Sequence, residues 1–313
     1  MRDILRRLVA GDLTEEEAVS ELRRLQLDEL GGRAKLDLGR FMRRGIPEVV
    51  LASGKAPADA ARLAIAMAER QGQGLISRMS DAHKAALQNA ADAAGMQVIG
   101  YASSARVVRP GFVPESLDCR VGILTAGTSD LPAAEEAKMV VEACGVEVRL
   151  HADLGVAGLH RFVGPLASTL EWGAEVIIVA AGMDGVLPGL VAGLIDVPVI
   201  GLPVSTGYGR GGAGEAALTT MLQSCSTGLV VVNIDNGVGA GAAAVLIAQR
   251  RLRGRTVATM AKTSAASKSA PTTIGKTARH ISTPPGTAKV SASTTTTKKT
   301  AASSHGKPRR GRP

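Results

Sequence analysis

Apolar and polar positions alternate regularly from about residue 118 to residue 253, and this alternation is the clearest signal in the chain. Short runs rich in Val, Ile and Leu predict buried strands, and the longer amphipathic stretches between them predict helices. The predicted strands are residues 120–127, 146–153, 175–182, 198–204 and 229–235, and the predicted helices are 131–144, 158–172, 187–194, 213–225 and 240–252. Strands that alternate with helices predict a parallel sheet with right-handed crossovers and a helical layer on each face.

The N-terminal part of the chain has a less regular pattern. Thr14 followed three residues later by Glu17 is the signature of a capped helix start. Further along, the predicted strands are residues 49–51 and 97–103, and the predicted helices are 58–71 and 79–94. We therefore expect a small α/β domain over residues 1–115, followed by the regular α/β domain over 116–253.

The polar and glycine-rich turns of the second domain all follow predicted strands. In residues 122–136, "GILTAGTSDLPAAEE", the apolar run stops abruptly, and Ser129 or Asp130 can cap the helix that follows. This is an ordinary capped connection, but it also directs backbone N–H groups towards an anionic ligand. Because the carboxyl ends of parallel strands share one edge of a sheet, we expect the turns to meet there around a ligand.

Composition narrows the class of protein. The chain has 45% apolar residues and only six aromatic ones, so its core consists mainly of Ala, Val, Leu and Ile. Three cysteines without paired spacing, Cys119, Cys144 and Cys225, argue against a disulfide framework and a zinc site. The N-terminus lacks an export signal, and no uncharged apolar run is long enough to cross a bilayer. We expect a cytoplasmic protein with no membrane partner.

Charge is distributed unevenly along the chain. Residues 254–313 contain 12 Lys and Arg and no Asp or Glu, so a tail of charge +12 follows a body of charge −3. The tail is rich in Ser, Thr, Ala, Lys and Pro and lacks apolar periodicity, which predicts disorder. Its basic residues leave open a contact with nucleic acid, against the simpler interpretation of a solvated tail.

Three stretches together resemble a known family. They are "GILTAGTSDLPAAEEA", "AAGMDGVLPGLVAGL" with "VPVIGLPVSTGYG", and "LQSCSTGLVVVNIDNGVGAG". Over residues 1–253 the chain is similar to the LarB family, the pyridinium-3,5-biscarboxylic acid mononucleotide synthases of nickel-pincer nucleotide biosynthesis. The resemblance implies a PurE-like, flavodoxin-like three-layer domain preceded by a smaller α/β domain. It also implies a homo-oligomer, since PurE-like domains resemble parts of octamers.

The resemblance further implies a reaction. The pyridinium ring of nicotinic acid adenine dinucleotide is carboxylated with carbon dioxide or bicarbonate, and the phosphoanhydride is hydrolysed to release AMP. The electron-poor ring cannot attack carbon dioxide unaided, but a thiolate added to a neighbouring ring carbon makes it a nucleophilic dihydropyridine. Cys225 in "QSCSTG" matches the family's catalytic cysteine. For Cys119 and Cys144 we keep the interpretation of inert, buried thiols.

Asp184 is the candidate base. It stands in "AAGMDGVLP", where LarB proteins usually have a glutamate and purine carboxylases have an Ala-His pair. The shorter carboxylate can still accept a proton, although its reach differs. Asp184 is also suited to cap the helix predicted at 187–194, and both roles can hold together.

Other polar residues of the turns are candidates for substrate binding. The candidate set is Gly127, Thr128, Ser129, Asp130, His160, Ser205, Gly207, Tyr208 and Asn236. Asp153 or His160 could orient phosphate or water, and Asp235 could hold Mg²⁺ beside the phosphates or simply form the turn. Basic side chains of the N-terminal domain could pair with phosphates or stay solvated; they are Lys35, Arg40, Arg44 and Lys55.

Two other functions fit parts of the sequence. The first is a phosphoribosylaminoimidazole carboxylase or mutase of purine biosynthesis, against which the missing Ala-His pair and the presence of Cys225 count. The second is a nucleic-acid-associated protein that acts through its basic tail. The acidic body and the few aromatic side chains available for base stacking count against that function.

Overall fold

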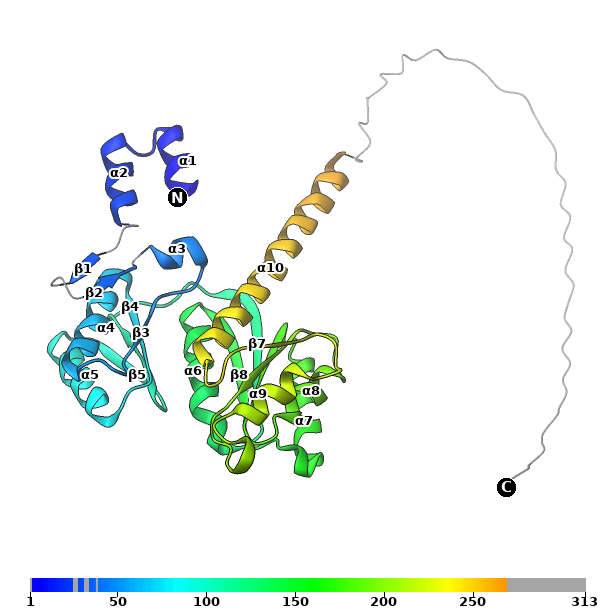
Figure 1. The fold of residues 1–313 in the computed structure, drawn as a ribbon. Coiled ribbons are helices and arrows are strands. Elements are labelled where there is room, and N and C mark those ends of the chain that lie inside the picture. Colours follow the sequence, from blue (N-terminus) through cyan, green and yellow to red (C-terminus); the bar gives the residue numbers. More distant parts are fainter. Residues whose placement is uncertain (1, 25–27, 31–33, 38, 269–313) are drawn as a thin grey trace, which may run out of the picture. The chain divides into compact units, whose positions relative to one another are not determined.

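Two main sheets, each with its own helices, form the core of the computed structural model (Figure 1). The structure describes residues 2–24, 28–30, 34–37 and 39–268. Residues 1–265 group into one compact unit. Among the helices of the described residues, none is long and apolar enough to cross a membrane.

The chain begins with two short helices, α1 (Arg2–Ala10) and α2 (Glu15–Arg24). The capped start of α2 is confirmed, because the Glu17 N–H donates to Thr14 Oγ1 at 3.2 Å and the Thr14 N–H donates to Glu17 Oε2 at 2.8 Å. The elements that follow are an antiparallel pair, β1 (Asp28–Leu30) with β2 (Ala34–Leu36), and the short helix α3 (Arg40–Arg44).

A mixed four-stranded sheet forms the core of the N-terminal domain. Its order is β3 (Val49–Leu51), β4 (Gln73–Ser77), β6 (Ser104–Val108) and β5 (Gln97–Tyr101). Its helices are α4 (Pro57–Gln71) and α5 (Asp81–Ala93). The predicted helices and the strands β3 and β5 are confirmed. The strands β4 and β6 were not predicted from the sequence pattern. Arg106 interrupts the apolar run of β6, yet it is buried and donates to Gln73 Oε1 at 3.0 Å.

The second domain contains the predicted parallel sheet. Its five strands are β7 (Leu117–Thr125), β8 (Val146–His151), β9 (Val176–Ala181), β10 (Val199–Pro203) and β11 (Leu229–Val231). They lie in the order β11-β10-β9-β7-β8, and every pair is parallel. Read from the other edge this is the flavodoxin-like order 2-1-3-4-5, so the predicted fold class is confirmed.

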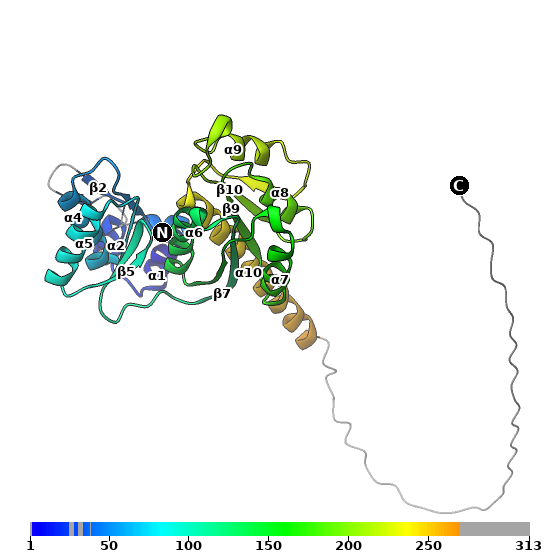
Figure 2. The ribbon, with the colours of Figure 1, turned by 90° about the horizontal axis from the view of Figure 1, so that it is seen from below.

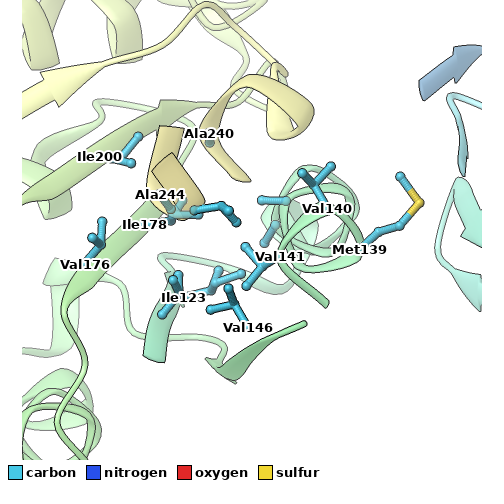
Figure 3. Close-up of a cluster of buried hydrophobic side chains, with 14 of the residues drawn as sticks. Ile123, Met139, Val140, Val141, Val146, Val176, Ile178, Ile200, Ala240 and Ala244 are labelled. Atoms are coloured by element: carbon cyan, nitrogen blue, oxygen red, sulfur yellow. The ribbon is translucent and has the colours of Figure 1, made fainter. Parts of the chain in front are cut away.

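Helices cover both faces of this sheet (Figure 2). They are α6 (Leu131–Ala143), α7 (His160–Glu171), α8 (Val186–Ala192), α9 (Glu215–Leu222) and α10 (Gly237–Lys268). One buried cluster joins the sheet to α6 and α10, and a second joins it to α7, α8 and α9. Alternate strand residues therefore serve alternate faces, and Figure 3 shows Ile123, Ile178 and Ile200 on the face of α6 and α10.

The strand order places a topological switch point between β7 and β9. The connection after β7 passes through α6 on one face, and the connection that enters β9 passes through α7 on the other. The two loops that leave the carboxyl ends of such neighbours diverge and leave a crevice in which open α/β sheets bind their ligands. The segment 127–130 follows β7, and the segment 182–185 follows β9.

The last helix differs from its prediction. α10 continues from Gly237 to Lys268, beyond the boundary expected after residue 253. The expected disorder is therefore wrong for residues 254–268, whose backbone is helical. Residues 255–268 contain no Gly or Pro and include four Ala, the residue with the highest helix propensity. The remainder of the predicted disordered tail, residues 269–313, lies outside the described residues.

Candidate functional site

The turns after the parallel strands meet, as the sequence predicted. The Ala126 N–H donates to Ala180 O at 2.9 Å, and the Leu154 N–H donates to Thr125 O at 2.9 Å. On the other side, the Val204 N–H donates to Ala181 O at 3.0 Å, and the turn after β11 joins through the Asp235 N–H and Pro203 O at 2.9 Å. These bonds tie the five turns into one edge of the sheet.

Asp130 lies at the centre of this edge and is 4% exposed. Its Oδ2 accepts the Gly127 N–H at 2.8 Å, and its Oδ1 accepts the Thr206 hydroxyl at 3.0 Å. Asp130 stands at the N-cap position of α6 but makes no side-chain bond to that helix, so the expected capping role is wrong for this residue. Its carboxylate instead closes its own turn and ties it to the loop after β10.

Burial raises the pKa of the Asp130 carboxyl, while hydrogen bonds from Gly127, Thr206 and Gly182 act in the opposite direction. The space around this carboxylate is tight. A Cβ on Gly182 would lie 2.7 Å from Thr206 Oγ1 and 3.2 Å from Asp130 Oδ1, so this position requires glycine. Local pattern reasoning missed Thr206, because its partner lies in a distant part of the chain.

The hydrogen bonds of the Asp130 carboxylate leave the neighbouring residues Thr128 and Ser129 accessible to a ligand. Thr128 and Ser129 are exposed in a single turn of 3-10 helix, Thr128–Asp130, at the end of β7. Gly127 opens this turn in an extended conformation. The predicted substrate-binding turn is therefore formed by exposed residues on a fixed base.

Asp184 is exposed in the turn after β9, beside the residues above. Its Oδ1 accepts the Val186 N–H, the first of α8, at 3.3 Å, in agreement with a capping role. The loop after β10 covers this turn, because a Cβ on Gly207 would lie 3.0 Å from Met183 N. Tyr208 follows and is 79% exposed. The structure thus brings Asp184, Gly207 and the Asp130 turn together.

The second turn holds an ion pair. Asp153 Oδ1 lies 3.0 Å from Arg161 Nη1, and both side chains are partly exposed. His160 is the exposed first residue of α7. Gly155 brings this turn against the first one, because a Cβ there would lie 3.1 Å from Ala126 O. His160 and Asp153 are therefore at the same edge as Asp130.

The residues around Asp235 form two hydrogen-bonded turns. Asp235 Oδ1 accepts the Ser205 N–H at 2.9 Å, and Asn236 Oδ1 accepts the Gly239 N–H at 2.8 Å, which caps α10. Among the described residues no group of three or more His, Cys, Asp or Glu side chains gathers to form an all-protein metal cage. Asp235 and Asn236 thus shape two turns, and a magnesium ion at Asp235 stays a prediction.

Cys225 lies at the opposite end of the sheet. α9 ends at Leu222, so Cys225 stands in the loop that follows and not at the predicted helix end. The Gly228 carbonyl in this loop accepts the Val199 N–H, at the start of β10. α8 begins beside Asp184, its Gly189 faces Ser224, and Gly193, just beyond its last residue, faces Ser226. Cys225 therefore lies beside the second half of α8, away from Asp184 in one chain.

The three thiols differ in exposure. Cys225 is exposed, whereas Cys119 and Cys144 are buried as predicted. Burial raises the pKa of the Cys144 thiol to about 12, so this thiol stays protonated at neutral pH. Among the proposed phosphate partners, Arg40, Arg44 and Lys55 are exposed, and the side chain of Lys35 lies outside the described residues.

Comparison with known proteins agrees with this two-domain arrangement. The family model of the LarB/PurE-like N-terminal domain matches residues 27–110, and that of AIR carboxylase matches residues 120–270. An uncharacterized protein of Methanocaldococcus jannaschii is 38% identical over 256 residues, which cover 80% of this chain and 97% of the relative. The chain belongs to the LarB/PurE-like family. It is therefore a carboxylase-type enzyme of that family.

Some relatives that match less than half of this chain carry a purine-pathway name. The N5-carboxyaminoimidazole ribonucleotide mutase of Thermotoga maritima is 31% identical over 131 residues, 41% of this chain and 74% of the relative. The crystal structure of a Treponema denticola PurE2 variant matches 49% of this chain and 98% of its own, with 18% identity and a TM-score of 0.35.

Proposed function

We propose that this LarB/PurE-like enzyme carboxylates the pyridinium ring of nicotinic acid adenine dinucleotide and hydrolyses its phosphoanhydride. The products are pyridinium-3,5-biscarboxylic acid mononucleotide, for nickel-pincer nucleotide synthesis, and AMP. The observation that carries the proposal is the exposed thiol of Cys225 in a chain that has the LarB-type N-terminal domain. Carbon dioxide or bicarbonate is the co-substrate.

The Cys225 thiolate supplies the electrons that the ring lacks. It forms a C–S bond to the ring carbon beside the one to be carboxylated, and the electron pair displaced into the ring makes an enamine. The enamine carbon then forms a C–C bond to carbon dioxide. Asp184 removes the proton from the newly carboxylated carbon, and that C–H electron pair expels the thiolate and restores the aromatic ring.

The remaining candidate residues bind the dinucleotide in this proposal. The backbone N–H groups and hydroxyls of Thr128 and Ser129 meet a phosphate or ribose oxygen at the switch point. Ser205, Gly207 and Tyr208 close over the ligand from the neighbouring loop, and His160 orients the water that attacks the phosphoanhydride. Asp130 does not contact the ligand in this proposal. Its carboxylate holds the turn of Gly127 and the loop of Thr206 in place.

The distance between Cys225 and Asp184 leads us to propose that each site takes its thiol from a second copy of the chain. In one chain the two side chains lie near opposite ends of α8. The surroundings of Cys225 suit a contact between copies, because Leu222 is 66% exposed and Val230 is 52% exposed on the outer strand β11. A homo-oligomer, which we expect to be an octamer, brings this loop to a neighbour's turns.

Product analysis tests the reaction directly. The purified protein is incubated with nicotinic acid adenine dinucleotide, ¹³C-bicarbonate and magnesium, and the products are weighed by mass spectrometry. We expect a labelled biscarboxylic mononucleotide and equimolar AMP. Without bicarbonate, the carboxylated product should disappear. Absence of both products from a folded preparation would overturn the proposal.

A purine-pathway activity is the second candidate, favoured by the similarity to the Thermotoga maritima mutase. The same preparation is therefore incubated with N5-carboxyaminoimidazole ribonucleotide. We expect no conversion above the uncatalysed rate, because Asp184 and Gly185 stand where the purine carboxylases carry an Ala-His pair. Rapid conversion, together with failure on the dinucleotide, would assign the enzyme to purine biosynthesis.

A further inference from the structure

The N-terminal domain reaches the candidate site through one side chain. Arg78 follows β4 of the N-terminal sheet, and its Nη2 donates to the carbonyl oxygen of Asp235 at 2.8 Å. Asp235 belongs to the turn between β11 and α10, at the carboxyl edge of the parallel sheet. Both residues have left-handed backbones, with φ of 54° for Arg78 and 55° for Asp235. Residues other than glycine adopt this conformation where the surroundings hold them in it.

A continuous set of hydrogen bonds runs from this contact to the proposed substrate turn. Asp235 Oδ1 accepts the Ser205 N–H at 2.9 Å. The next residue, Thr206, donates its hydroxyl to Asp130 Oδ1 at 3.0 Å, and Asp130 Oδ2 accepts the Gly127 N–H at 2.8 Å. The turn held by Arg78 therefore holds the loop that contains Ser205, Gly207 and Tyr208.

The positive charge of Arg78 also acts on a buried carboxylate beside the Asp235 turn, that of Glu136. Glu136 of α6 is buried, and its Oε2 accepts the Val238 N–H of α10 at 3.1 Å. Burial raises the pKa of Glu136, while the bond from Val238 and the positive charge of Arg78 act in the opposite direction. A Cβ on Gly237 would lie 2.8 Å from this carboxylate, so the turn and α6 are tightly packed. Arg78 thus binds a turn whose opposite side is packed against α6.

We propose that Arg78 is a positioning residue for substrate binding, through which the LarB-type N-terminal domain orders the loop after β10. The inference rests on the proposed function. The residues that it orders are expected to bind the dinucleotide and not to make or break bonds. Loss of the Arg78 contact should therefore weaken substrate binding more than it slows the chemical steps, and KM should rise while kcat changes little.

The test compares Arg78→Met with Arg78→Lys. Methionine keeps the apolar stem and removes the donor and the charge, and lysine restores one charged donor, which suffices for a single carbonyl acceptor. For Arg78→Met we expect KM for the dinucleotide to rise about tenfold or more, the effect of a lost charge-assisted hydrogen bond, with kcat within about twofold. Arg78→Lys should recover most of the parental KM. Arg62→Met is the matched control, because Arg62 is exposed on α4 and pairs with Asp59.

Hydrogen exchange of the free protein provides the readout that does not depend on the reaction. Peptides that cover residues 203–208 should exchange faster in Arg78→Met than in the parent and in Arg62→Met, because the Ser205 N–H loses its fixed acceptor. Parental KM together with parental exchange in Arg78→Met would overturn the inference. If the parent forms no carboxylated product, the proposed function fails, and the exchange arm still decides whether Arg78 orders the loop.

Discussion

At the level of single residues, the sequence indicated where the polar groups lie but not what holds them. The Ser-Asp turn predicted a helix start capped by Ser129 or Asp130, and the structure instead buries Asp130 and pairs it with Thr206. This partner could not be predicted, because a local pattern carries no information about a residue 76 positions away. The exposure of Cys225 was equally invisible, since most free cysteines are buried. Both residues now support specific predictions.

Replacement of the exposed thiol tests covalent catalysis. Cys225→Ser should reduce formation of the biscarboxylic mononucleotide by about 10³-fold or more, because a serine alkoxide is far less available than a thiolate near neutral pH. Folding and dinucleotide binding should be retained, since the side chain is exposed. The measurement is product mass against time. A rate near the parental value would remove the thiol from the mechanism.

The two buried thiols are the matched controls. Cys119→Ser and Cys144→Ser should keep the parental rate per folded molecule and lower the melting temperature, because each places a hydroxyl in an apolar core. Iodoacetamide at pH 8 should alkylate Cys225 and spare Cys144, whose pKa is raised to about 12 by burial. Alkylation of Cys144 in the native protein at the rate of Cys225 would contradict the burial that the structure shows.

Asp184 has two roles that substitution can separate. Asp184→Asn keeps an oxygen for the Val186 N–H but cannot accept a proton, so we expect a folded enzyme that turns over about 10²-fold or more slowly. Asp184→Glu should retain activity, because its carboxylate keeps the base. A rapid-mixing absorbance trace should show the dihydropyridine accumulating in the Asn variant. Equal rates for the Asn variant and the parent would leave Asp184 with the cap alone.

At the level of elements, the alternation of strands and helices predicted the parallel sheet because its strands are buried on both faces. Element ends were less predictable. α9 stops at Leu222 where the loop of Cys225 packs on α8, and α10 runs on to Lys268. The strands β4 and β6 were missed, since one is a short run that contains Gly74 and the other contains Arg106. Tertiary contacts decide each of these cases.

The C-terminal extension should be dispensable. Among the described side chains, the packing of α10 on the core reaches Leu252, so truncation after Arg253 removes none of the contacts that hold the sheet. We expect turnover within about twofold of the parent and an unchanged melting temperature for truncations after Arg253 and after Lys268. Steady-state kinetics and thermal unfolding measure both quantities. A large loss of activity in a folded truncation would show that the extension takes part in catalysis.

At the level of the whole molecule, the two domains are joined by specific bonds. The Gln73 side chain donates to Ala143 O at 2.8 Å, Tyr101 donates its hydroxyl to Glu142, and Arg78 holds the Asp235 turn. The sequence predicted both domains and their order from the change of pattern near residue 115 and from the family resemblance over residues 1–253. The order of elements implies that Cys225, which precedes the strand at 229–235, lies at the opposite end of the sheet from Asp184, which follows the strand at 175–182. The motif match alone does not show this separation.

Mixing of variants tests whether the site is shared between copies. Chains with Asp184→Asn and chains with Cys225→Ser are inactive alone, but a neighbour pair that combines the intact Asp184 of one with the intact Cys225 of the other has a complete site. Random co-assembly of equal amounts should therefore restore about a quarter of the parental activity. The matched control mixes the parent with the double variant. A shared site again gives about a quarter, whereas a site within one chain gives about a half in this control and nothing in the first mixture. The second pair of values would place both residues in the same chain, and would require the loop of Cys225 to move along α8 to reach the substrate.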